Sequence, residues 1–415
     1  MGNEGGVKMK KLVVLLAIFP LLFCKETSKG NPYKAQLIKG PYVRHITSSS
    51  ATIMWETDIS TDSVLNYSET KGGWWSAGTK SVKEILINGI PANINRGEIT
   101  SLTPDKTYYY KVVSLKEPTE IYSFKTAPSS SGAFRFIAYG DTRGTVAGEQ
   151  VNHKTIVDAI TKIDPQPLLI LNTGDIVNSG IYITSPGSIG PNEWQLFFDT
   201  IQPLVNHIAY YIGVGNHDYS GSGEDKFKVF AAYFPFEGNK ETYYSFDIGV
   251  VHFIVLNSET DFGIGSTQHT WLKNDLASAV QGSKFTIAAF HRPPYSSSGH
   301  GSDLETREAF STLFEQYKVD LVINGHNHAY ERSCPVITVA CDNTNGVIYI
   351  VAGAGGAPLY GCDEEPLPPG IIQYCKKEHL FTILDVSCDP DCSIKGSTLN
   401  AGLTEVDSFT ITSRR

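Results

Sequence analysis

Five short polar segments, spread over nearly two hundred residues, constrain this chain more than any other feature. Four of them directly follow an apolar run, and the third follows the run Tyr210–Val214, so each is expected to be a loop at the end of a buried strand. Loops at the carboxyl ends of strands line the crevice where open α/β sheets bind ligands. The five segments are therefore expected to meet at one site. They are Gly140-Asp141, Gly174-Asp175, Gly215-Asn216-His217-Asp218, His291 and Gly325-His326-Asn327-His328.

The side chains in these segments are metal ligands by type. Aspartate, asparagine and histidine offer oxygen and imidazole nitrogen donors, which suit transition metals better than calcium. Six such ligands with one shared carboxylate suffice for two metal ions a few ångströms apart, the arrangement used for phosphate-ester hydrolysis. A single Gly-Asp is ordinarily a turn, but five segments in this order, each behind a strand, are poorly explained as turns alone.

The order of these segments resembles the calcineurin-like metallophosphoesterase superfamily. Two longer stretches, residues 291–295 (His-Arg-Pro-Pro-Tyr) and 324–332 (Asn-Gly-His-Asn-His-Ala-Tyr-Glu-Arg), narrow the resemblance to purple acid phosphatases. The resemblance covers about residues 33–390, because an amino-terminal β domain of the expected kind is also present. It implies a β-sandwich amino-terminal domain plus an α/β metallophosphoesterase domain, in which a two-sheet sandwich is flanked by helices.

The resemblance also implies a ligand set for two metal ions. Asp175 would bridge both ions, which suits a carboxylate with two oxygens. The first ion would also be bound by Asp141 and His328. The second ion would be completed by three further side chains: Asn216, His291 and His326.

Three other residues acquire catalytic roles by the same resemblance. His217 would lie near the substrate oxygens, with its ring oriented by Asp218. His300, nine residues after His291, falls where relatives place a proton donor for the leaving group. Its loop is rich in serine and glycine, so a mobile, solvated histidine remains an alternative.

The chain departs from the purple acid phosphatase pattern at the first metal. Those enzymes carry a tyrosine three residues after the bridging aspartate, and its phenolate binds ferric iron and gives the colour. Here that position is Asn178. Many other metallophosphoesterases supply an Asp-x-His instead, but Arg143 stands in place of that histidine. Losing the phenolate weakens the case for stable ferric iron, so the two ions are expected to be iron, zinc or manganese.

The departure leaves alternatives open for one ligand of the first ion and for Arg143. Water, Asn178 or His153 would supply the missing ligand of the first ion. The alternative for His153 is a position on a helix surface. Arg143 is either an exposed turn residue or a phosphate clamp.

These features predict a dinuclear-metal phosphoesterase that hydrolyses phosphate monoesters by attack of a metal-bound hydroxide. Either His300 or His217 would protonate the leaving alcohol. Two alternatives stay open: a phosphodiesterase or nucleotidase on the same scaffold, and a non-catalytic surface binding protein whose catalytic domain has decayed. The complete ligand set argues against decay, because ligands should be lost first.

Composition limits the partners. A length of 415 residues suggests two or three domains. The formal net charge of −9 argues against nucleic acid as a partner, since nucleic acid needs a basic face. It does not argue against a small phosphorylated substrate, because two metal ions dominate the local field.

The first domain is expected at residues 33–127, where short β-type runs alternate with turn residues. Trp55 is expected in its core. The stretch Leu102–Tyr108 resembles the fibronectin type III pattern that leads to a tyrosine corner, so the Tyr108 hydroxyl would bond back to the preceding loop. The aromatic residues have an alternative role as a carbohydrate-binding platform, and Trp74-Trp75 has no assigned place.

After a linker, Ala127–Gly132, the pattern becomes β-α-β and predicts a catalytic domain at residues 133–415. Helices are expected at residues 153–163, 194–201, 270–280 and 305–317. Further strands are expected at residues 242–246, 250–256, 285–290, 321–323, 347–351 and 407–413.

Residues 1–24 are typical of a secretion signal: lysines at 8, 10 and 11 precede the apolar run Leu12–Phe23. The run ends at Cys24, and residues 21–24 resemble a bacterial lipobox, although Phe23 stands where a small residue is usual. We expect an exported protein, periplasmic or at the cell surface, with membrane attachment through a lipidated Cys24. The alternative is a plain cleaved signal.

The other six cysteines lie within the last 82 residues, and their short spacing favours pairing between neighbours. The favoured pairs are Cys334–Cys341, Cys362–Cys375 and Cys388–Cys392. Zinc binding by the last pair is the weaker alternative, because a second close pair is missing. Disulfides in an oxidising compartment fit the expected export.

Overall fold

The structure is a computed structural model. It describes residues 35–81, 85–87, 90–114, 116–130, 132–144, 150–180, 193–219, 226–235, 242–279, 281–389 and 391–414. The expected signal at residues 1–24, with Cys24, lies outside these residues. Within the described part of the chain, no helix is long and apolar enough to cross a membrane.

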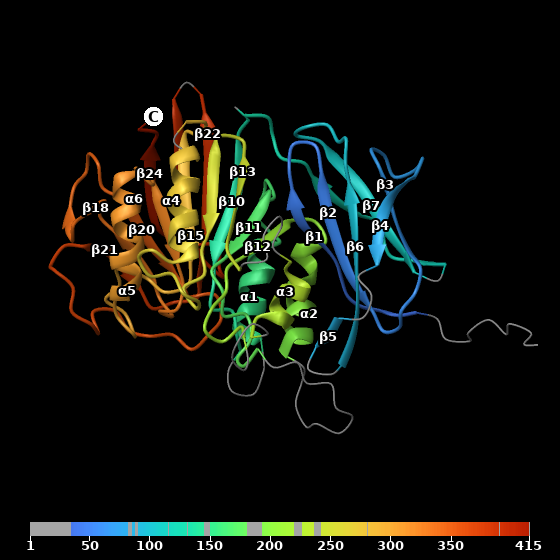
Figure 1. The fold of residues 1–415 in the computed structure, drawn as a ribbon, viewed down its shortest axis with the longest axis horizontal. Helices are drawn as coiled ribbons and strands as arrows, with labels where there is room; N and C mark the ends of the chain where they lie inside the picture. Colours follow the sequence, from blue (N-terminus) through green and yellow to red (C-terminus); the bar gives the residue numbers. More distant parts are fainter. Residues whose placement is uncertain are drawn as a thin grey trace, which may run out of the picture. The chain divides into compact units, whose positions relative to one another are not determined.

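The amino-terminal part is a β-rich domain, as predicted (Figure 1). Its strands pair in the order β1-β2-β6-β4-β3-β7-β8, with β5 added to β6 and β9 to β7. Trp55 is fully buried, and the backbone N–H of Thr103 donates to the Tyr108 hydroxyl at 2.9 Å, which confirms the tyrosine corner. The strands are β1 Leu37–Ile46, β2 Ala51–Thr57, β3 Ser63–Ser68, β4 Trp75–Ser81, β5 Ile85–Ile87, β6 Ile90–Ile99, β7 Thr107–Ser114, β8 Glu117–Pro118 and β9 Tyr122–Lys125.

The unassigned tryptophan pair lies on β4 and just before it. Trp75 is half exposed and packs edge-on against Tyr67, with ring centroids 5.5 Å apart. The ammonium of Lys111 lies 4.6 Å from the centroid of the Trp74 ring.

Two sheets form the second part of the chain. The first has the order β12-β11-β10-β22-β23-β24, and the second has the order β13-β14-β15-β16-β20-β17-β21. Strands β10, β11 and β12 run parallel, as do β14, β15, β16 and β20. The first sheet contains β10 Phe134–Tyr139, β11 Leu169–Asn172, β12 Ala209–Ile212, β22 Leu380–Cys388, β23 Cys392–Asn400 and β24 Glu405–Thr412; the second contains β13 Tyr244–Ile248, β14 Val251–Val255, β15 Phe285–Phe290, β16 Leu321–Asn324, β17 Tyr330–Ser333, β20 Ile348–Ala352 and β21 Ile372–Lys376.

All five polar segments follow the carboxyl ends of these strands, which confirms the expected placement. The segments leave β10, β11 and β12 in the first sheet and β15 and β16 in the second. Because neighbouring parallel strands end at the same edge, the arrangement brings loops distant in sequence to one place.

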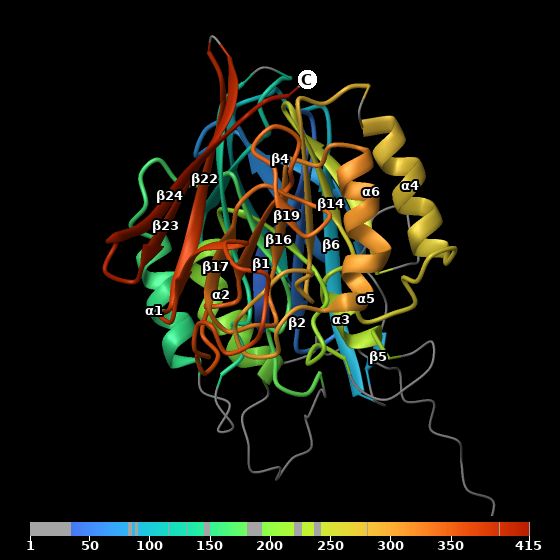
Figure 2. The same ribbon diagram turned by 90° about the vertical axis from the view of Figure 1, so that its left-hand side faces the viewer.

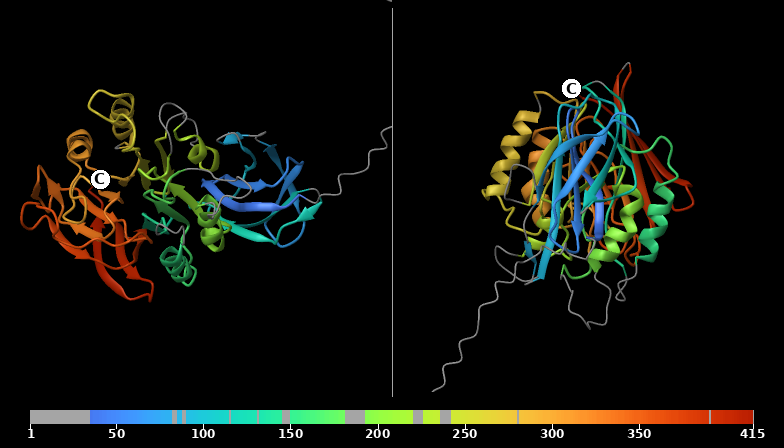
Figure 3. Two further views of the ribbon diagram at one scale, coloured as in Figure 1. Left: turned by 90° about the horizontal axis from the view of Figure 1, so that it is seen from below. Right: turned by 90° about the vertical axis from the view of Figure 1, so that its right-hand side faces the viewer.

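Helices cover the outer face of each sheet, so a helix layer lies on either side of the strands (Figures 2 and 3). Side chains of β10 alternate between two cores: Phe136 and Ala138 face the interior shared by the sheets, whereas Ile137 and Tyr139 pack with helix residues such as Ile156. This period of two is the pattern expected of a strand buried on both faces. The helices are α1 Val151–Ile160, α2 Glu193–Val205, α3 Lys228–Tyr233, α4 Thr267–Ala279, α5 Leu304–Thr306 and α6 Thr312–Gln316.

The helix expected at residues 305–317 is present over residues 304–316, but it is not α-helical throughout. A π-helical turn, Arg307–Ser311, separates α5 from α6. Two other features were not predicted: the long hairpin of β22 and β23, and the strands β17 and β21 that extend the second sheet. The small hairpin of β18 (Val336–Ile337) and β19 (Ala340–Cys341) completes the described strands.

Buried polar contacts join the β-rich domain to the catalytic part. The Tyr42 hydroxyl donates to the carbonyl of Tyr233 at 2.8 Å, and the Tyr110 hydroxyl donates to the carbonyl of Asn206 at 2.8 Å. The buried guanidinium of Arg44 donates to the carbonyl of Tyr210 on β12. The amino-terminal domain therefore supports the strand that carries the third polar segment.

The three predicted disulfides are present: Cys334–Cys341, Cys362–Cys375 and Cys388–Cys392. The last closes the turn between β22 and β23, so the zinc alternative for that pair is wrong. The second links β21 to the loop that follows β20, a connection that matters for the site described below.

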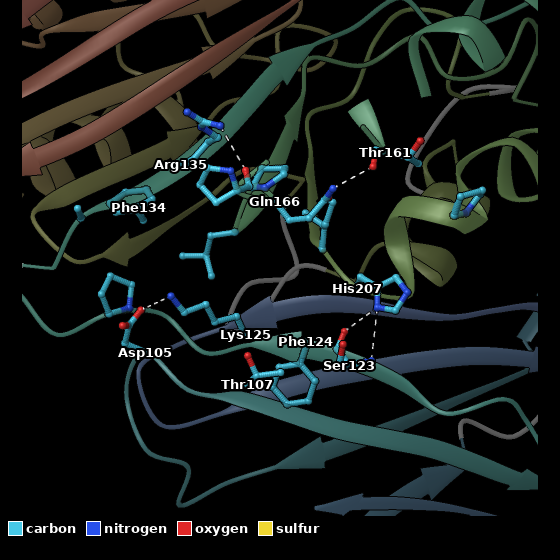
Figure 4. Close-up of a pocket in the computed structure, with 17 residues that line it drawn as sticks. Asp105, Thr107, Ser123, Phe124, Lys125, Phe134, Arg135, Thr161, Gln166 and His207 are labelled. Atoms are coloured by element: carbon cyan, nitrogen blue, oxygen red, sulfur yellow. Dashed lines mark hydrogen bonds and ion pairs between the residues drawn. The ribbon is translucent and has the colours of Figure 1, made fainter. Parts of the chain in front are cut away.

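A cavity of about 610 Å³ lies between the β-rich domain and the amino-terminal ends of β10, β11 and β12 (Figure 4). Phe134, Leu168 and Ile208 line it at the beginning of those strands. Its polar rim is internally paired, for example Lys125 with Asp105 at 2.5 Å. The polar segments lie at the other ends of these strands. This cavity is therefore separate from the candidate metal site.

A buried histidine between two carboxylates gives the fold a pH dependence. His252 on β14 bonds Asp247 at 2.7 Å and Asp275 of α4 at 2.8 Å. Burial lowers the pKa of His252, but the two carboxylates outweigh it and raise the pKa to about 9. The folded-state pKa exceeds the ordinary value of about 6.5, so this stabilisation is complete below pH 6.5 and is lost as the pH rises through 9.

We therefore expect the free energy of unfolding of the wild type to fall between pH 6 and pH 9.5 by about 2–3 kcal/mol more than that of His252→Gln. Urea denaturation at the two pH values measures this difference. Parallel pH dependences in the two proteins would contradict the assignment.

Candidate metal centre

Three of the predicted ligands have an unusual backbone. Asp141, Asp175 and His326 have φ angles of 53°, 55° and 69°, in the left-handed region that side chains other than glycine rarely adopt. Each follows a glycine in sequence. Such strain persists only where the surroundings fix it, and it concentrates at functional sites.

The glycines of the motifs are required by the closeness of the loops. A Cβ on Gly140 would lie 1.9 Å from Thr173 Oγ1, and one on Gly215 would lie 2.2 Å from Asp175 Oδ1. A Cβ on Gly325 would lie 2.4 Å from Asp141 Oδ2. Backbone from one loop therefore packs directly against the carboxylate of another, and no side chain fits between them.

One group of donors comes from four different loops. Asn216 Oδ1 lies 2.9 Å from His326 Nδ1 and 3.1 Å from His291 Nε2. His291 Nε2 lies 3.4 Å from Asp175 Oδ1. These are the four side chains expected to hold the second ion.

A second group adjoins it. His328 Nε2 lies 3.5 Å from Asp141 Oδ1. Ligand atoms of Asp141, Asp175 and His291 all lie within 4.8 Å of one another, and all three residues are buried. The structure thus brings together all six predicted ligands, although their binding of metal stays a prediction.

The donor set fits metal ions in two further respects. Asp141 Oδ1 is buried and accepts no hydrogen bond from the residues that the structure describes. The Nδ1 atoms of two histidines donate to carbonyls, His328 to Pro358 at 2.7 Å and His291 to Thr173 at 3.1 Å. Each pairing leaves the Nε2 atom facing the carboxylates, as in metal-binding histidines.

The pKa values of two histidines indicate that the donor cluster stabilises positive charge. Burial disfavours the charged form of His291, but Asp175 and Asp141 outweigh it and raise its pKa to about 10. Burial, together with the charge of His291, lowers the pKa of His326 to about 2. The His291 ring thus holds a proton next to the carboxylates of Asp175 and Asp141. Bound metal ions would replace this proton as the positive charge.

His217 lies beside the ligand cluster, but its orienting partner differs from the predicted one. Its Nε2 lies 3.9 Å from Asp175 Oδ2, and its Nδ1 donates to the carbonyl of Asn178 at 2.7 Å. Asp218 instead accepts the backbone N–H groups of Gly215, Asp175 and Ile176, each at 2.8 Å. The prediction that Asp218 orients the His217 ring is therefore wrong, because its carboxylate is used to join two loops.

Arg143 is not an exposed turn residue. Its guanidinium is largely buried, with Nε 3.5 Å from Asp175 Oδ2, and it donates from Nη1 to Asn178 Oδ1 at 3.0 Å. Its Nε has no hydrogen-bond acceptor among the described residues. The two departures from the family pattern, at 143 and 178, are thus in contact with each other.

His153 lies neither on a helix surface nor among the ligands. It is buried, with Nδ1 2.6 Å from Gln150 Oε1 and Nε2 3.3 Å from the Tyr139 hydroxyl. Burial lowers the pKa of His153 to about 3, so the ring is neutral. Both interpretations of His153 are corrected, because its two ring nitrogens are bonded inside the core.

The loop that carries His300 is held by residues that the sequence analysis missed. The backbone N–H of His300 donates to Asn327 Oδ1 at 2.9 Å, and its ring stacks on His326 with centroids 4.6 Å apart. Asn327 also donates to Ser296 Oγ at 2.6 Å. Glu331 accepts from the backbone and hydroxyl of Ser297 at 2.9 and 2.6 Å. Asn327 and Glu331 both lie in the quoted stretch 324–332.

A sixth loop was also missed. Residues 353–361 follow β20 and return over the site: the N–H of Ala357 donates to the carbonyl of Asp141 at 2.8 Å. A Cβ on Gly353 would lie 2.9 Å from Asp141 Oδ2. The signal was present, because this glycine-rich segment follows an apolar strand just as the other five do.

Several known proteins are similar to this chain. Residues 134–330 match the calcineurin-like phosphoesterase family, and residues 42–126 match the purple acid phosphatase N-terminal domain. The chain is 30% identical to "Probable purple acid phosphatase 20" of Arabidopsis thaliana, over 73% of this chain and 70% of that protein. It is 30% identical to "Purple acid phosphatase 15" of Arabidopsis thaliana, over 65% of this chain and 55% of that protein.

A solved purple acid phosphatase from yellow lupin (Lupinus luteus) seeds has the same fold, with a TM-score of 0.75 at 23% identity, covering 90% of this chain and 74% of the lupin chain. The fold and the donor cluster together define a calcineurin-like metallophosphoesterase. Within that class, the chain belongs to the purple acid phosphatase family of metal-dependent phosphatases.

The central carboxylate supplies a direct test. Asp175→Asn should lose both metal ions, because a neutral amide offers neither the charge nor two equivalent oxygens to a shared position. Elemental analysis of the purified variant measures the loss. Asp158→Asn, which changes an exposed carboxylate on α1, serves as the control and should retain its metal. Two equivalents of metal in Asp175→Asn would refute the bridging role.

Proposed function

We propose that this chain is a dinuclear-metal phosphatase that hydrolyses phosphate monoesters. The observation that carries the proposal is the convergence of six donor side chains from five loops, two of them buried carboxylates. Asp141, His328 and the shared Asp175 would hold one ion. Asp175, together with Asn216, His291 and His326, would hold the other. Bound metal ions supply acidified water and charge neutralisation at phosphorus.

The chain's own residues would bind and orient the phosphoryl group. Arg143 supports this role because its buried Nε lacks an acceptor, and a guanidinium is suited to phosphate oxygens. His217 faces the same carboxylate with Nε2, while its Nδ1 is fixed by the Asn178 carbonyl. Both side chains thus lie near the Asp175 carboxylate, and both would contact a bound phosphate.

His300 is the proposed donor to the leaving group. It is exposed at the site, stacked on His326, and its backbone is held by Asn327. Breaking the bond between phosphorus and the ester oxygen leaves negative charge on that oxygen, and a proton from the His300 ring would neutralise it.

Iron, zinc and manganese remain the proposed metal ions. With Asn178 in place of a tyrosine, and its Oδ1 bonded to Arg143, this loop supplies no phenolate. We also propose that the protein is exported, periplasmic or at the cell surface, with Cys24 as a lipid attachment. The three disulfides are consistent with an oxidising compartment.

The function is tested by comparing two substrates with the same leaving group. The metal-loaded protein should hydrolyse 4-nitrophenyl phosphate with a higher kcat/KM than bis(4-nitrophenyl) phosphate. A preference for the diester would favour the phosphodiesterase alternative. Metal-loaded protein that hydrolyses neither would favour a binding protein.

Colour tests the first metal position. Iron-loaded protein should lack the intense visible band of a ferric phenolate, because position 178 offers no phenolate. Absorption spectroscopy of protein with measured iron content is the experiment. An intense band would overturn this expectation. If that band vanished in Tyr360→Phe, it would come from the tyrosine that stacks on His328.

A further inference from the structure

One tyrosine, Tyr360, contacts both a predicted metal ligand and the proposed proton donor. It belongs to none of the five sequence segments and has no role in the proposed mechanism. The Tyr360 ring stacks on His328 with centroids 4.3 Å apart and planes 13° from parallel. Its edge meets the His300 ring at 5.4 Å, and its hydroxyl lies 3.4 Å from His300 Nε2. Tyr360 therefore bridges a predicted metal ligand and the proposed proton donor.

Two backbone features hold the Tyr360 ring in this position. The N–H of Tyr360 donates to the carbonyl of His328 at 2.9 Å. On the opposite loop, Gly299 has a φ of 52°, and a Cβ there would lie 2.2 Å from Tyr360 Cδ2. The glycine next to His300 thus leaves the space that the tyrosine ring occupies.

Further hydrogen bonds join the two loops beyond Tyr360. The N–H groups of Glu364 and Glu365 donate to the Ser297 carbonyl at 2.8 and 2.9 Å. The N–H of Gly299 donates to Glu364 Oε2 at 3.2 Å. Three hydrogen bonds therefore join the segment 360–365 to the His300 loop.

A disulfide bond joins the segment 360–365 to the second sheet. Cys362, two residues after Tyr360, is bonded to Cys375 on β21. Cys375 pairs in register with Glu331 on β17, the residue that binds Ser297. The disulfide and Glu331 thus anchor the two loops to adjacent positions of one sheet.

We propose that Tyr360 positions His300 at the leaving-group side of the site, and that the Cys362–Cys375 disulfide holds Tyr360 there; this inference rests on the proposed function. In the step concerned, the bond between phosphorus and the ester oxygen breaks and that oxygen takes a proton from His300. A hydroxyl either donates to a bare ring nitrogen or accepts from a protonated one. The contact with Tyr360 therefore holds the ring whichever nitrogen carries the proton.

The test compares leaving groups. 4-Nitrophenolate leaves without help, whereas an alkoxide needs a proton, so a misplaced His300 should penalise ethyl phosphate selectively. In Tyr360→Phe, the ratio of kcat for ethyl phosphate to kcat for 4-nitrophenyl phosphate should fall by about tenfold or more. Metal content should stay at the wild-type value. An unchanged ratio, with or without a general loss of rate, would overturn the proposal.

A double-mutant cycle isolates the route through His300. Tyr360→Phe should lower the ratio no further in a His300→Gln background, because the ring that it positions is absent. A further fall of similar size in that background would overturn the positioning role. Wild-type protein that hydrolyses neither monoester would instead refute the proposed function, which separates the two failures.

The disulfide has a matched control in the same protein. Cys362→Ser with Cys375→Ser should lower the ratio as Tyr360→Phe does. Cys334→Ser with Cys341→Ser removes a disulfide next to the β18–β19 hairpin and should leave the ratio at the wild-type value. Equal ratios in the two double variants would overturn the role assigned to Cys362–Cys375.

Discussion

The site depends on the burial of three carboxylates, Asp141, Asp175 and Asp218, close to one another. Burial, and after it the charge of Asp175, raise the pKa of Asp218 to about 7, so the charged form of this carboxyl is disfavoured in the site. Backbone N–H groups compensate Asp218, and the His291 proton and Arg143 partly compensate the others. Buried charge of this density is stable only when it is paired, so bound metal ions would stabilise the fold as well as supply the proposed chemistry.

The sheets make this concentration of charge possible. Asp141 and Asp175 follow the neighbouring parallel strands β10 and β11, so their side chains meet without any long loop. Glycines then let backbone from the other loops approach the carboxylates, at a cost in chain entropy that packing must offset. Asp218 joins the second and third loops through their N–H groups. Asp218, which was predicted to assist catalysis, thus has a structural role. Its loss would loosen both of these ligand loops.

Sequence patterns predicted what is local. The runs before the ligand segments, the neighbouring cysteine pairs and the Tyr108 corner each depend on residues close in sequence, and the structure confirms them. Contacts between loops of different strands were not predictable in this way. His153 has helical spacing, and only packing against Gln150 and Tyr139 shows that its nitrogens are occupied. Tyr360 was missed although its loop follows a strand, because no metal-ligating side chain marked it.

The two departures from the family pattern have one physical explanation. Arg143 and Asn178 replace residue types that bind the first metal in relatives, and they are hydrogen-bonded to each other beside Asp175. A guanidinium at this position adds a fixed positive charge where relatives place an anionic or neutral ligand. That charge repels a trivalent ion more than a divalent one, since Coulomb energy scales with the product of the charges. It would also attract a phosphate dianion. In the proposed mechanism, the protein would therefore take over from the metal part of the neutralisation of the substrate.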